Sequence, residues 1–304
     1  MPHNFCSNIK KVRHLILNEK VDYLIPISAP GHIIVGIINM ISKTRLPIIK
    51  ICLDSVPPVK NFLNKYLHNS LTDYFIFPGL STKIKYVAFN IKNYSILHAP
   101  LDIDTFTDFN PVEDYKNIYG IPKNKIIVSF IGRFSPEKGI LFLLEIIKYV
   151  VKELDNIFFI LSGSEEQIKF AEVQNQLRIY NIEDKVKILN KVDDVRKIIS
   201  ITDIGILSSR YSEYICRIAM EFMAFKKPIV APNVNVIPEV VGNYTNGFIY
   251  KLNDTTEAAQ HILKLSNDSK LRNNMGVNSF LRIQNCYSIT VFANQIKEIL
   301  DLNK

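Results

Sequence analysis

Two glutamates in a largely apolar segment, Glu213 and Glu221, have the type and spacing to do chemistry. They lie in SEYICRIAMEFMAFKKPIVAPN (212–233). An unpaired carboxylate is costly to bury, and a separation of ~2.2 helical turns lets both face broadly one way. Because carboxylates accept strong hydrogen bonds from hydroxyl groups, the pair predicts a polar, sugar-like ligand in front of the helix. The alternatives are a metal site, which the lack of a nearby His or Asp disfavours, a solvated pair, or an ion pair between one glutamate and Arg217.

A cationic turn, GRFSPEKG (132–139), could hold the other end of such a ligand. It starts at Gly132 and carries Arg133 and Lys138 ahead of an expected helix. A helix N-terminus offers free N–H groups and a positive dipole end. Each side-chain charge ~4 Å from a phosphate contributes roughly 4 kcal/mol at an effective dielectric of ~20. The turn therefore predicts a diphosphate cradle, and a surface turn with solvated charges is the alternative.

Two weaker patterns are also present. In LSGSEE (161–166), Gly163 could let a ligand approach the backbone closely, although a plain strand–helix turn has the same composition. The aspartates of DID (102–104) match a D-x-D metal-binding pattern, but they lie between the expected domains rather than in a catalytic loop. Arg133 and Lys138 already supply positive charge for a diphosphate. We therefore expect metal-independent chemistry, with no metal ligands and no cofactor.

The elements that must position these residues alternate between strand and helix. Continuous apolar runs indicate strands buried on both faces, and the segments between them have helical spacing. Such alternation predicts a parallel, doubly wound α/β sheet that binds ligands beyond the C-terminal ends of its strands. The expected strands are 126–132, 157–163, 186–189, 204–209, 228–233 and 247–250. The turn 132–139 and the glutamate loop each follow one of them.

The N-terminal third has similar α/β texture, which predicts a second domain. Its expected strands are 21–28, 47–54, 73–79 and 94–100. A polar, turn-rich segment at 110–125 suggests the boundary. We expect a first domain at 1–110, a second domain at 111–285 that carries the cationic turn and the glutamates, and a C-terminal helix at 286–304 that packs back on the first domain.

Composition narrows the class of protein. The 304 residues are 47% hydrophobic and 22% charged, as in globular proteins, and the net charge of +8 favours anionic partners. Nucleic-acid binding has only this charge in its favour. The four cysteines form no C-x-x-C pair, which fits a reducing cytosol. We expect a cytoplasmic protein whose basic surface can rest on the anionic inner face of a membrane.

Together, GRFSPEKG, the E-x7-E of SEYICRIAME, PIVAPNVNVIPEVVG and the upstream HAPLDIDTF resemble a known family. The chain is similar to the family 4 retaining glycosyltransferases, also called glycosyl transferases group 1. The resemblance implies a GT-B-like fold of two Rossmann-like, doubly wound domains facing a cleft, here with an incomplete first domain. It implies transfer of a sugar from a UDP-, GDP- or ADP-sugar to a hydroxyl of a glycan or lipid-linked acceptor. Cell-envelope polysaccharide or lipopolysaccharide synthesis is the expected setting.

The resemblance also implies roles for individual residues. Arg133 and Lys138 would hold the donor diphosphate, Glu213 would bind the hydroxyls of the donor sugar, and Glu221 would bind the ribose. The other donor-side positions that it implies are Gly132, Gly163, Tyr214, Ile215, Cys216, Ile237 and Glu239. The family has E-G-F-G where this chain has bulkier residues after its first glutamate. Because the first domain is incomplete relative to the family, a non-catalytic remnant that binds nucleotide sugars is the alternative, whereas an oxidoreductase would need a G-x-G-x-x-G that the chain lacks.

Overall fold

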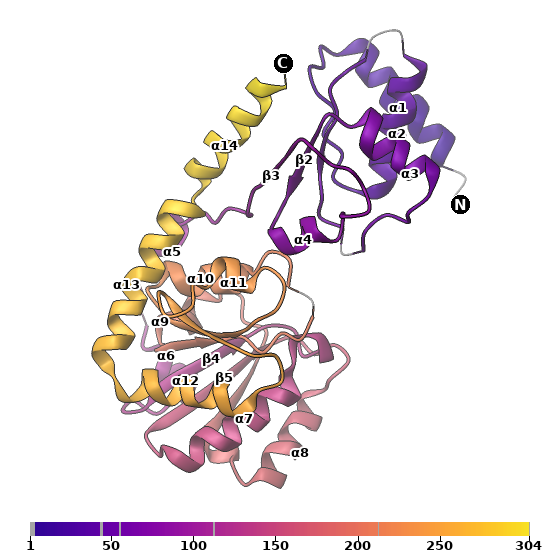
Figure 1. The fold of residues 1–304 in the computed structure, drawn as a ribbon. Helices are drawn as coiled ribbons and strands as arrows, with labels where there is room; N and C mark the ends of the chain where they lie inside the picture. Colours follow the sequence, from indigo (N-terminus) through magenta and orange to yellow (C-terminus); the bar gives the residue numbers. More distant parts are fainter. Residues whose placement is uncertain (1–3, 43–44, 55, 112, 212, 304) are drawn as a thin grey trace. The chain divides into compact units, whose positions relative to one another are not determined.

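The chain forms two compact units in a computed structural model (Figure 1). The structure describes residues 4–42, 45–54, 56–111, 113–211 and 213–303. The first unit comprises Met1–Ala99 and Phe292–Lys304, and the second comprises Pro100–Val291. Each unit is built on a parallel β-sheet.

The second unit contains a six-stranded parallel sheet in the order β6-β5-β4-β7-β8-β9. The chain runs outward from β4 through β5 to β6, returns to the other side of β4, and then runs outward again from β7 to β9. This is the doubly wound order, with its reversal between β4 and β7. The strands are β4 (Ile126–Ile131), β5 (Ile157–Gly163), β6 (Val186–Asn190), β7 (Ile204–Ile206), β8 (Ile229–Pro232) and β9 (Gly247–Tyr250).

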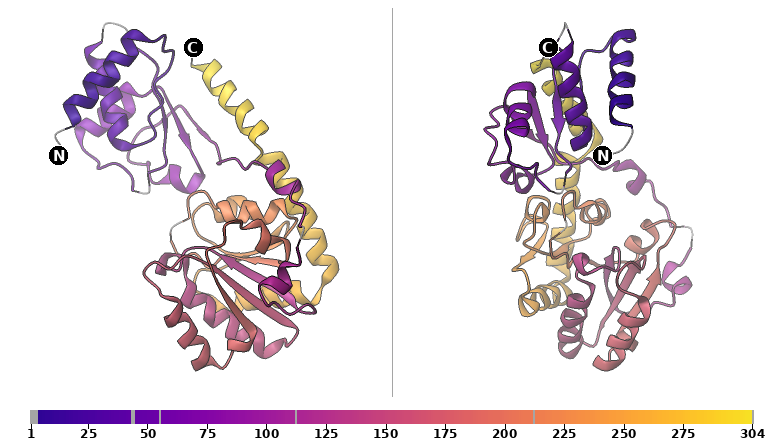
Figure 2. Two further views of the ribbon diagram at one scale, coloured as in Figure 1. Left: turned by 180° about the vertical axis from the view of Figure 1, so that it is seen from behind. Right: turned by 90° about the vertical axis from the view of Figure 1, so that its right-hand side faces the viewer.

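Helices cover both faces of this sheet (Figures 1 and 2). On one face α7 and α12 pack side by side, and on the other α10 and α11 enclose a second apolar cluster. The helices are α5 (Asp104–Thr107), α6 (Tyr115–Ile118), the 3-10 turn η2 (Pro136–Lys138), α7 (Ile140–Glu153), α8 (Phe170–Tyr180), the 3-10 turn η3 (Glu183–Lys185), α9 (Arg196–Ser200), α10 (Arg217–Ala224), α11 (Ile237–Val240), α12 (Thr255–Asn267) and α13 (Ser269–Cys286). Burial on both faces explains why the central strands are continuous apolar runs in the sequence.

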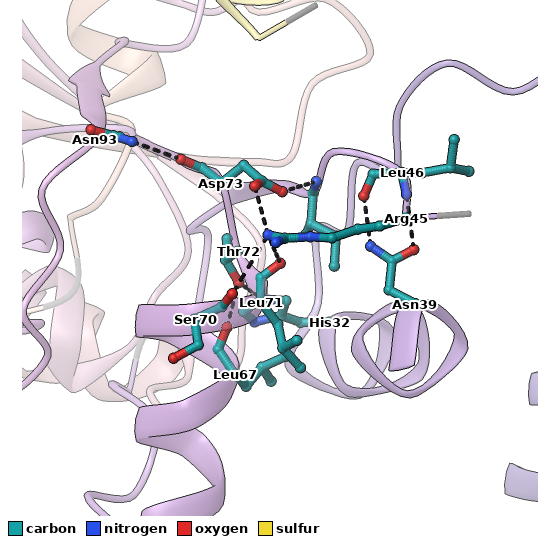
Figure 3. A network of polar contacts seen from close by, with 11 residues as sticks. His32, Asn39, Arg45, Leu46, Leu67, Ser70, Leu71, Thr72, Asp73 and Asn93 are labelled. Atoms are coloured by element: carbon teal, nitrogen blue, oxygen red, sulfur yellow. Dashed lines mark hydrogen bonds and ion pairs between the residues drawn. The ribbon is translucent and has the colours of Figure 1, made fainter. Parts of the chain in front are cut away.

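The first unit contains a three-stranded parallel sheet in the order β1-β2-β3. Its strands are β1 (Ile49–Ile51), β2 (Tyr74–Phe77) and β3 (Tyr94–Ile96). Its helices are α1 (Phe5–Asn18), α2 (Ala29–Ile41), α3 (Phe62–Tyr66), the π-helical η1 (Leu67–Leu71), α4 (Leu80–Ile84) and α14 (Ile289–Leu302). Ile299 of α14 packs in one cluster with Ile49 of β1 and Ile76 of β2. A polar network ties the starts of β1 and β2 together, because Asp73 accepts hydrogen bonds from the Arg45 guanidinium and the Ile48 amide (Figure 3).

Two expectations about the N-terminal third need correction. The segment 21–28 is not a full strand: it makes one β-bridge, Leu24 to Ile48, and Ile25 and Ile27 are exposed. The first unit also ends at Ala99, before the expected boundary at 110. The physical reason is that the segment after Pro100 packs its apolar side chains, including Phe106, into the core of the second unit. At the C-terminus the second unit extends to Val291, past the expected 285, because Tyr287 belongs to the same core.

Candidate functional site

The predicted cationic turn and glutamate loop follow adjacent strands of the second unit. The turn 132–139 comes directly after β4, and the loop 207–216 comes after β7. These strands are hydrogen-bonded neighbours at the point where the strand order reverses. Doubly wound sheets bind their ligands in the crevice at this reversal, outside the C-terminal strand ends. The fold therefore brings together two segments that lie far apart in the sequence.

Close backbone contacts hold the cationic turn in place. A Cβ atom on Gly163, the last residue of β5, would lie 1.7 Å from the carbonyl oxygen of Gly132. A Cβ atom on Gly139 would lie 2.1 Å from the Ser208 carbonyl oxygen, and Gly139 has a φ of +66°. Only glycine fits positions with such approaches. The turn is therefore packed tightly between the C-terminal ends of β5 and β7.

The centre of the site is an ion pair between Lys138 and Glu213. The Lys138 Nζ lies 2.5 Å from Glu213 Oε2, and the two side chains are 17% and 8% exposed. The Ser209 hydroxyl donates a second hydrogen bond, 2.8 Å long, to the same oxygen. Among the described residues, none forms a hydrogen bond or ion pair with Glu213 Oε1. The carboxylate is thus fixed in orientation while one oxygen remains able to accept a hydrogen bond from a ligand.

Arg133 has acidic partners of its own. Its guanidinium donates to both carboxylate oxygens of Glu166, at 2.9 and 3.0 Å, and lies 3.6 Å from Glu137. The hydrogen bond with Glu166 is the main cause that raises the pKa of Arg133. Arg133 is 51% exposed, and exposed pairs of this kind contribute only about 0–1 kcal/mol. The charge of Arg133 therefore stays accessible to an anion that can compete with Glu166.

Glu221 forms an ion pair with Arg217, which was one of the alternatives predicted from the sequence. The Arg217 Nε lies 2.9 Å from Glu221 Oε1, one turn apart on α10. Burial raises the pKa of Glu221, and the Arg217 charge opposes that shift. Arg217 is 74% exposed whereas Glu221 is 10% exposed. Glu221 is thus a mostly buried carboxylate with an exposed partner rather than one member of a fully buried pair.

The remaining predicted residues divide into backbone and side-chain positions. Cys216 is fully buried at the start of α10 with a φ of 61°, and Tyr214 and Ile215 precede it. Burial raises the pKa of the Cys216 thiol well above its ordinary value. Ile237 is fully buried, so only its backbone could reach a ligand. The backbone carbonyl of Glu239 is held by Arg282 and Tyr287.

Within the described part of the chain, no group of three or more His, Cys, Asp and Glu side chains is placed to hold a metal ion. No helix in that part is long and apolar enough to cross a bilayer. Sequence reasoning missed Ser209 and Glu166, which orient Glu213 and Arg133. Ser209 ends the expected strand 204–209 and Glu166 ends the weak pattern 161–166, so the place of each residue at the C-terminal end of a strand was the available signal.

Comparison with known proteins gives a family and several relatives. The family model described as glycosyl transferases group 1 matches residues 111–282, more than half of the chain. Spore coat protein SA of Bacillus subtilis is 24% identical over 263 residues, 84% of this chain and 67% of that protein. The UDP-Gal:alpha-D-GlcNAc-diphosphoundecaprenol alpha-1,3-galactosyltransferase of Escherichia coli is 23% identical over 208 residues, 67% of this chain and 53% of that protein. The chain thus spans between about half and two thirds of the length of these curated relatives.

Solved structures support the architecture. A glycosyltransferase from Rickettsia africae superposes with a TM-score of 0.86 and 20% identity, covering 99% of this chain and 81% of that one. Anabaena HepE, solved in complex with UDP, superposes with a TM-score of 0.84 and 19% identity, covering 98% and 81%. The likeness confirms the predicted α/β, GT-B-like fold class with Rossmann-like units.

Proposed function

The chain belongs to the glycosyl transferases group 1 family, and on this premise we propose that it transfers a sugar from a nucleotide-diphosphate sugar to a hydroxyl group of a glycan or lipid-linked acceptor. The transfer retains the configuration of the anomeric carbon and serves cell-envelope polysaccharide or lipopolysaccharide synthesis. Relatives whose names include a galactosyltransferase acting on a diphosphoundecaprenol-linked sugar and a capsular polysaccharide glycosyltransferase support this setting. The UDP in the HepE complex supports a nucleotide donor.

In the proposed reaction, the bond between the anomeric carbon and the diphosphate oxygen breaks while a bond to the acceptor oxygen forms. The departing phosphate oxygen takes the acceptor proton, so no side-chain base is needed. Arg133 and Lys138 stabilise the charge that develops on the diphosphate, a role that typically contributes about 3–4 kcal/mol per donor. Glu213 accepts hydrogen bonds from the donor sugar through Oε1, and Glu221 accepts them from the ribose. In this proposal the reaction is metal-independent.

One observation supports this proposal above the others: the Lys138–Glu213 ion pair at the strand-order reversal. An ammonium group has three N–H donors. Lys138 uses one of them on Glu213, so it can contact a phosphate without releasing the carboxylate. A single fixed pair thereby presents a cation to the diphosphate and a carboxylate oxygen to the sugar.

The direct test is turnover of a panel of UDP-, GDP- and ADP-sugars by the wild-type chain and by Arg133→Ala and Glu213→Ala. We expect a loss of at least about a hundredfold in each variant. Lys152→Ala, which removes an exposed lysine at the far end of α7, is the matched control and should match the wild type. Unchanged rates in both site variants would refute the assignment. Tight binding of a donor without any turnover would favour the non-catalytic alternative.

Peripheral contact with an anionic membrane is part of the same proposal, and an exposed apolar patch supports it. Four apolar side chains in the first unit are 73–79% exposed, with two exposed lysines beside them and no acidic residue in 55–72. We call these residues the apolar patch: Val56, Val59, Lys60, Phe62, Leu63 and Lys65. Apolar groups flanked by lysines suit the interface of an anionic bilayer.

The patch can be tested by co-sedimentation with phosphatidylcholine vesicles that contain or lack phosphatidylglycerol. We expect binding only with the anionic lipid, weakened by salt. The double variant Phe62→Ser/Leu63→Ser should bind at least about tenfold more weakly, because two exposed apolar anchors are lost. Val87→Ser, at a valine outside the patch that is 84% exposed, is the control. Equal binding by the double variant and the control would refute membrane contact through the patch.

A further inference from the structure

The second unit contains a cavity of about 490 Å³ beside the cationic turn. The start of α7, the start of α8 and the loop after β7 form its wall (Figure 1). Pro136 and Gly139 of the cationic turn line it, but none of the four charged side chains assigned to the donor site does. Its volume falls within the roughly 300–1,000 Å³ typical of small-molecule pockets. The cavity is therefore large enough for a ligand, and its wall does not include the donor-binding side chains.

Most of the wall is apolar. Ile140 and Ile168 are buried, whereas Leu141 is 39% exposed and Tyr211 is 58% exposed. The Phe142 ring completes this surface. Exposed apolar groups around a cavity gain free energy when an apolar ligand covers them, and an aromatic ring packs favourably against another ring. The wall therefore favours a ligand with a flat apolar body.

Arg210 supplies a positive charge in the same wall. Its side chain is half-buried, and the guanidinium Cζ lies 5.8 Å from the centroid of the Phe142 ring. The backbone N–H of Arg210 donates to the Glu137 carbonyl at 2.8 Å, which attaches the residue to the cationic turn. In the part of the chain that the structure describes, the guanidinium has no hydrogen-bond or ion-pair partner. Its five N–H donors are thus available to an acceptor on a ligand.

The charges around the cavity favour a ligand with one negative charge. An unpaired, half-buried guanidinium is stabilised by an anion, and its planar fork matches the two oxygens of a carboxylate. α7 begins at Ile140, and the N-terminal end of a helix also favours negative charge. Glu172, the one acid among the described lining residues, is exposed in the first turn of α8, so water and salt screen its repulsion. Among the same described residues Arg210 is the one cation, so a second negative charge on the ligand would stay unpaired.

We propose that this cavity binds an aromatic carboxylate, that is, one or two flat rings joined to a single carboxylate group. The carboxylate would accept two parallel hydrogen bonds from Arg210, and the rings would pack against Leu141 and Tyr211. A neutral ring of the same shape would lack the charge-assisted hydrogen bonds. An amine would be repelled by Arg210, and acetate would have no ring to bury. This binding needs neither a nucleotide sugar nor turnover, so it does not rest on the proposed function.

The test is methyl NMR of the full chain, labelled with ¹³C at the isoleucine and leucine methyl groups. The probes are indole-3-acetate and phenylacetate. Their neutral analogues are 3-methylindole and toluene, their amine analogues are tryptamine and benzylamine, and acetate supplies the charge without a ring. We expect at least one aromatic carboxylate to shift the methyl signals of Ile140, Leu141 and Ile168 saturably. The neutral and amine analogues of that ring should bind at least about tenfold more weakly, and acetate should leave the signals unchanged.

Variants of the wall assign the binding to its residues. Arg210→Gln should weaken carboxylate binding by at least about tenfold and leave the neutral analogues unaffected. Arg210→Lys keeps the charge but loses the planar fork, so it should restore part of the affinity. Leu141→Ser should weaken carboxylates and neutral analogues alike, because it removes apolar wall. Arg178→Gln, at an exposed arginine of α8 that does not line the cavity, is the matched control and should bind as the wild type does.

The outcomes either support the proposal or overturn it. Shifts that require the ring, the carboxylate and Arg210 together would support it. No response at the three wall methyl groups to either carboxylate would overturn it, as would equal binding of a carboxylate and its neutral analogue. Unchanged carboxylate binding by Arg210→Gln would overturn it too. The methyl signals of Ile157 and Ile206 in the sheet report whether that variant is folded; if they move, the comparison of Arg210→Lys with the wild type decides.

Discussion

Replacing Glu213 by glutamine tests whether the Lys138–Glu213 pair is the organising element of the donor site. Glutamine keeps the shape of the side chain and an oxygen for the Ser209 hydroxyl, but it removes the charge that faces Lys138. Lys138→Met removes the other charge at similar volume. The double variant removes both charges and leaves neither ion unpaired.

The expected magnitude follows from burial. Removing one partner of a fully buried pair costs about 3–5 kcal/mol, because the other charge stays desolvated. Lys138 is 17% exposed, so water can partly solvate it. We therefore expect Glu213→Gln to cost about 2–3 kcal/mol of unfolding free energy. Lys138→Met should cost somewhat more, because Glu213 is only 8% exposed. The double variant should lose about 2 kcal/mol less than the sum of the two, as expected for charges in contact.

The assay must report on the second unit alone, since a two-unit chain need not unfold in one transition. Amide hydrogen exchange followed by mass spectrometry in β7 and α10 meets this need. Donor turnover measured in the same samples should fall in both single variants and stay low in the double variant. Additive losses of stability, within about 0.5 kcal/mol, would show that the two charges do not interact. That result would refute the proposal that one fixed ion pair presents a cation to the diphosphate and a carboxylate to the sugar, even if each residue proved important by itself.

Three further predictions follow from other parts of the structure. The folded pKa of His32 is about 3 against 6.5 in the unfolded chain, so below pH 6.5 only the unfolded chain binds a proton at this ring and the free energy of unfolding decreases. Acidification to pH 5 should lower the free energy of unfolding of the first unit by about 2 kcal/mol. Hydrogen exchange at several pH values checks this, and His32→Gln should flatten the profile. Gly163→Ala should lower the melting temperature and abolish donor binding, because the added Cβ would lie 1.7 Å from the Gly132 carbonyl oxygen. A thermal-shift measurement with and without UDP tests both effects. The buried thiols of Cys52 and Cys216 should resist alkylation in the folded chain, whereas the exposed Cys6 and Cys286 should react. The reason is that burial raises the pKa of both buried thiols, that of Cys52 to about 12. Mass spectrometry of the labelled peptides checks this, and equal labelling of buried and exposed cysteines would contradict it.

The second unit could be predicted closely from the sequence because its strands are buried on both faces. The expected strand 157–163 coincides with β5, and 126–132 exceeds β4 by one residue. The first unit was harder to predict. The segment 21–28 contains several apolar residues, yet Ile25 and Ile27 are exposed and only Leu24 forms a β-bridge to a neighbour. An apolar run records the tendency to be buried, and tertiary contacts decide whether burial follows.

The sequence placed the candidate site residues at strand ends, but it could show only some of the ion pairs that they form. The i,i+4 spacing of Arg217 and Glu221 revealed their ion pair as an alternative in advance. The Lys138–Glu213 pair joins residues from two loops that approach only because β4 and β7 are adjacent. Strand order is a long-range property, so no local pattern in either loop could show it.

These differences in exposure suggest that some of the charged pairs can exchange partners with a ligand and that others cannot. The Arg133–Glu166 pair is partly exposed on both sides and contributes about 0–1 kcal/mol, whereas in the Arg217–Glu221 pair only the arginine is exposed. A hydrogen bond to a charged group contributes about 1.5–3 kcal/mol once it is desolvated. In the proposed donor site, a diphosphate would displace Glu166 from Arg133, and a ribose hydroxyl would share Glu221 with Arg217. The Lys138–Glu213 pair is too buried to exchange in this way, so the proposal requires it to keep its geometry while Arg133 changes its partner.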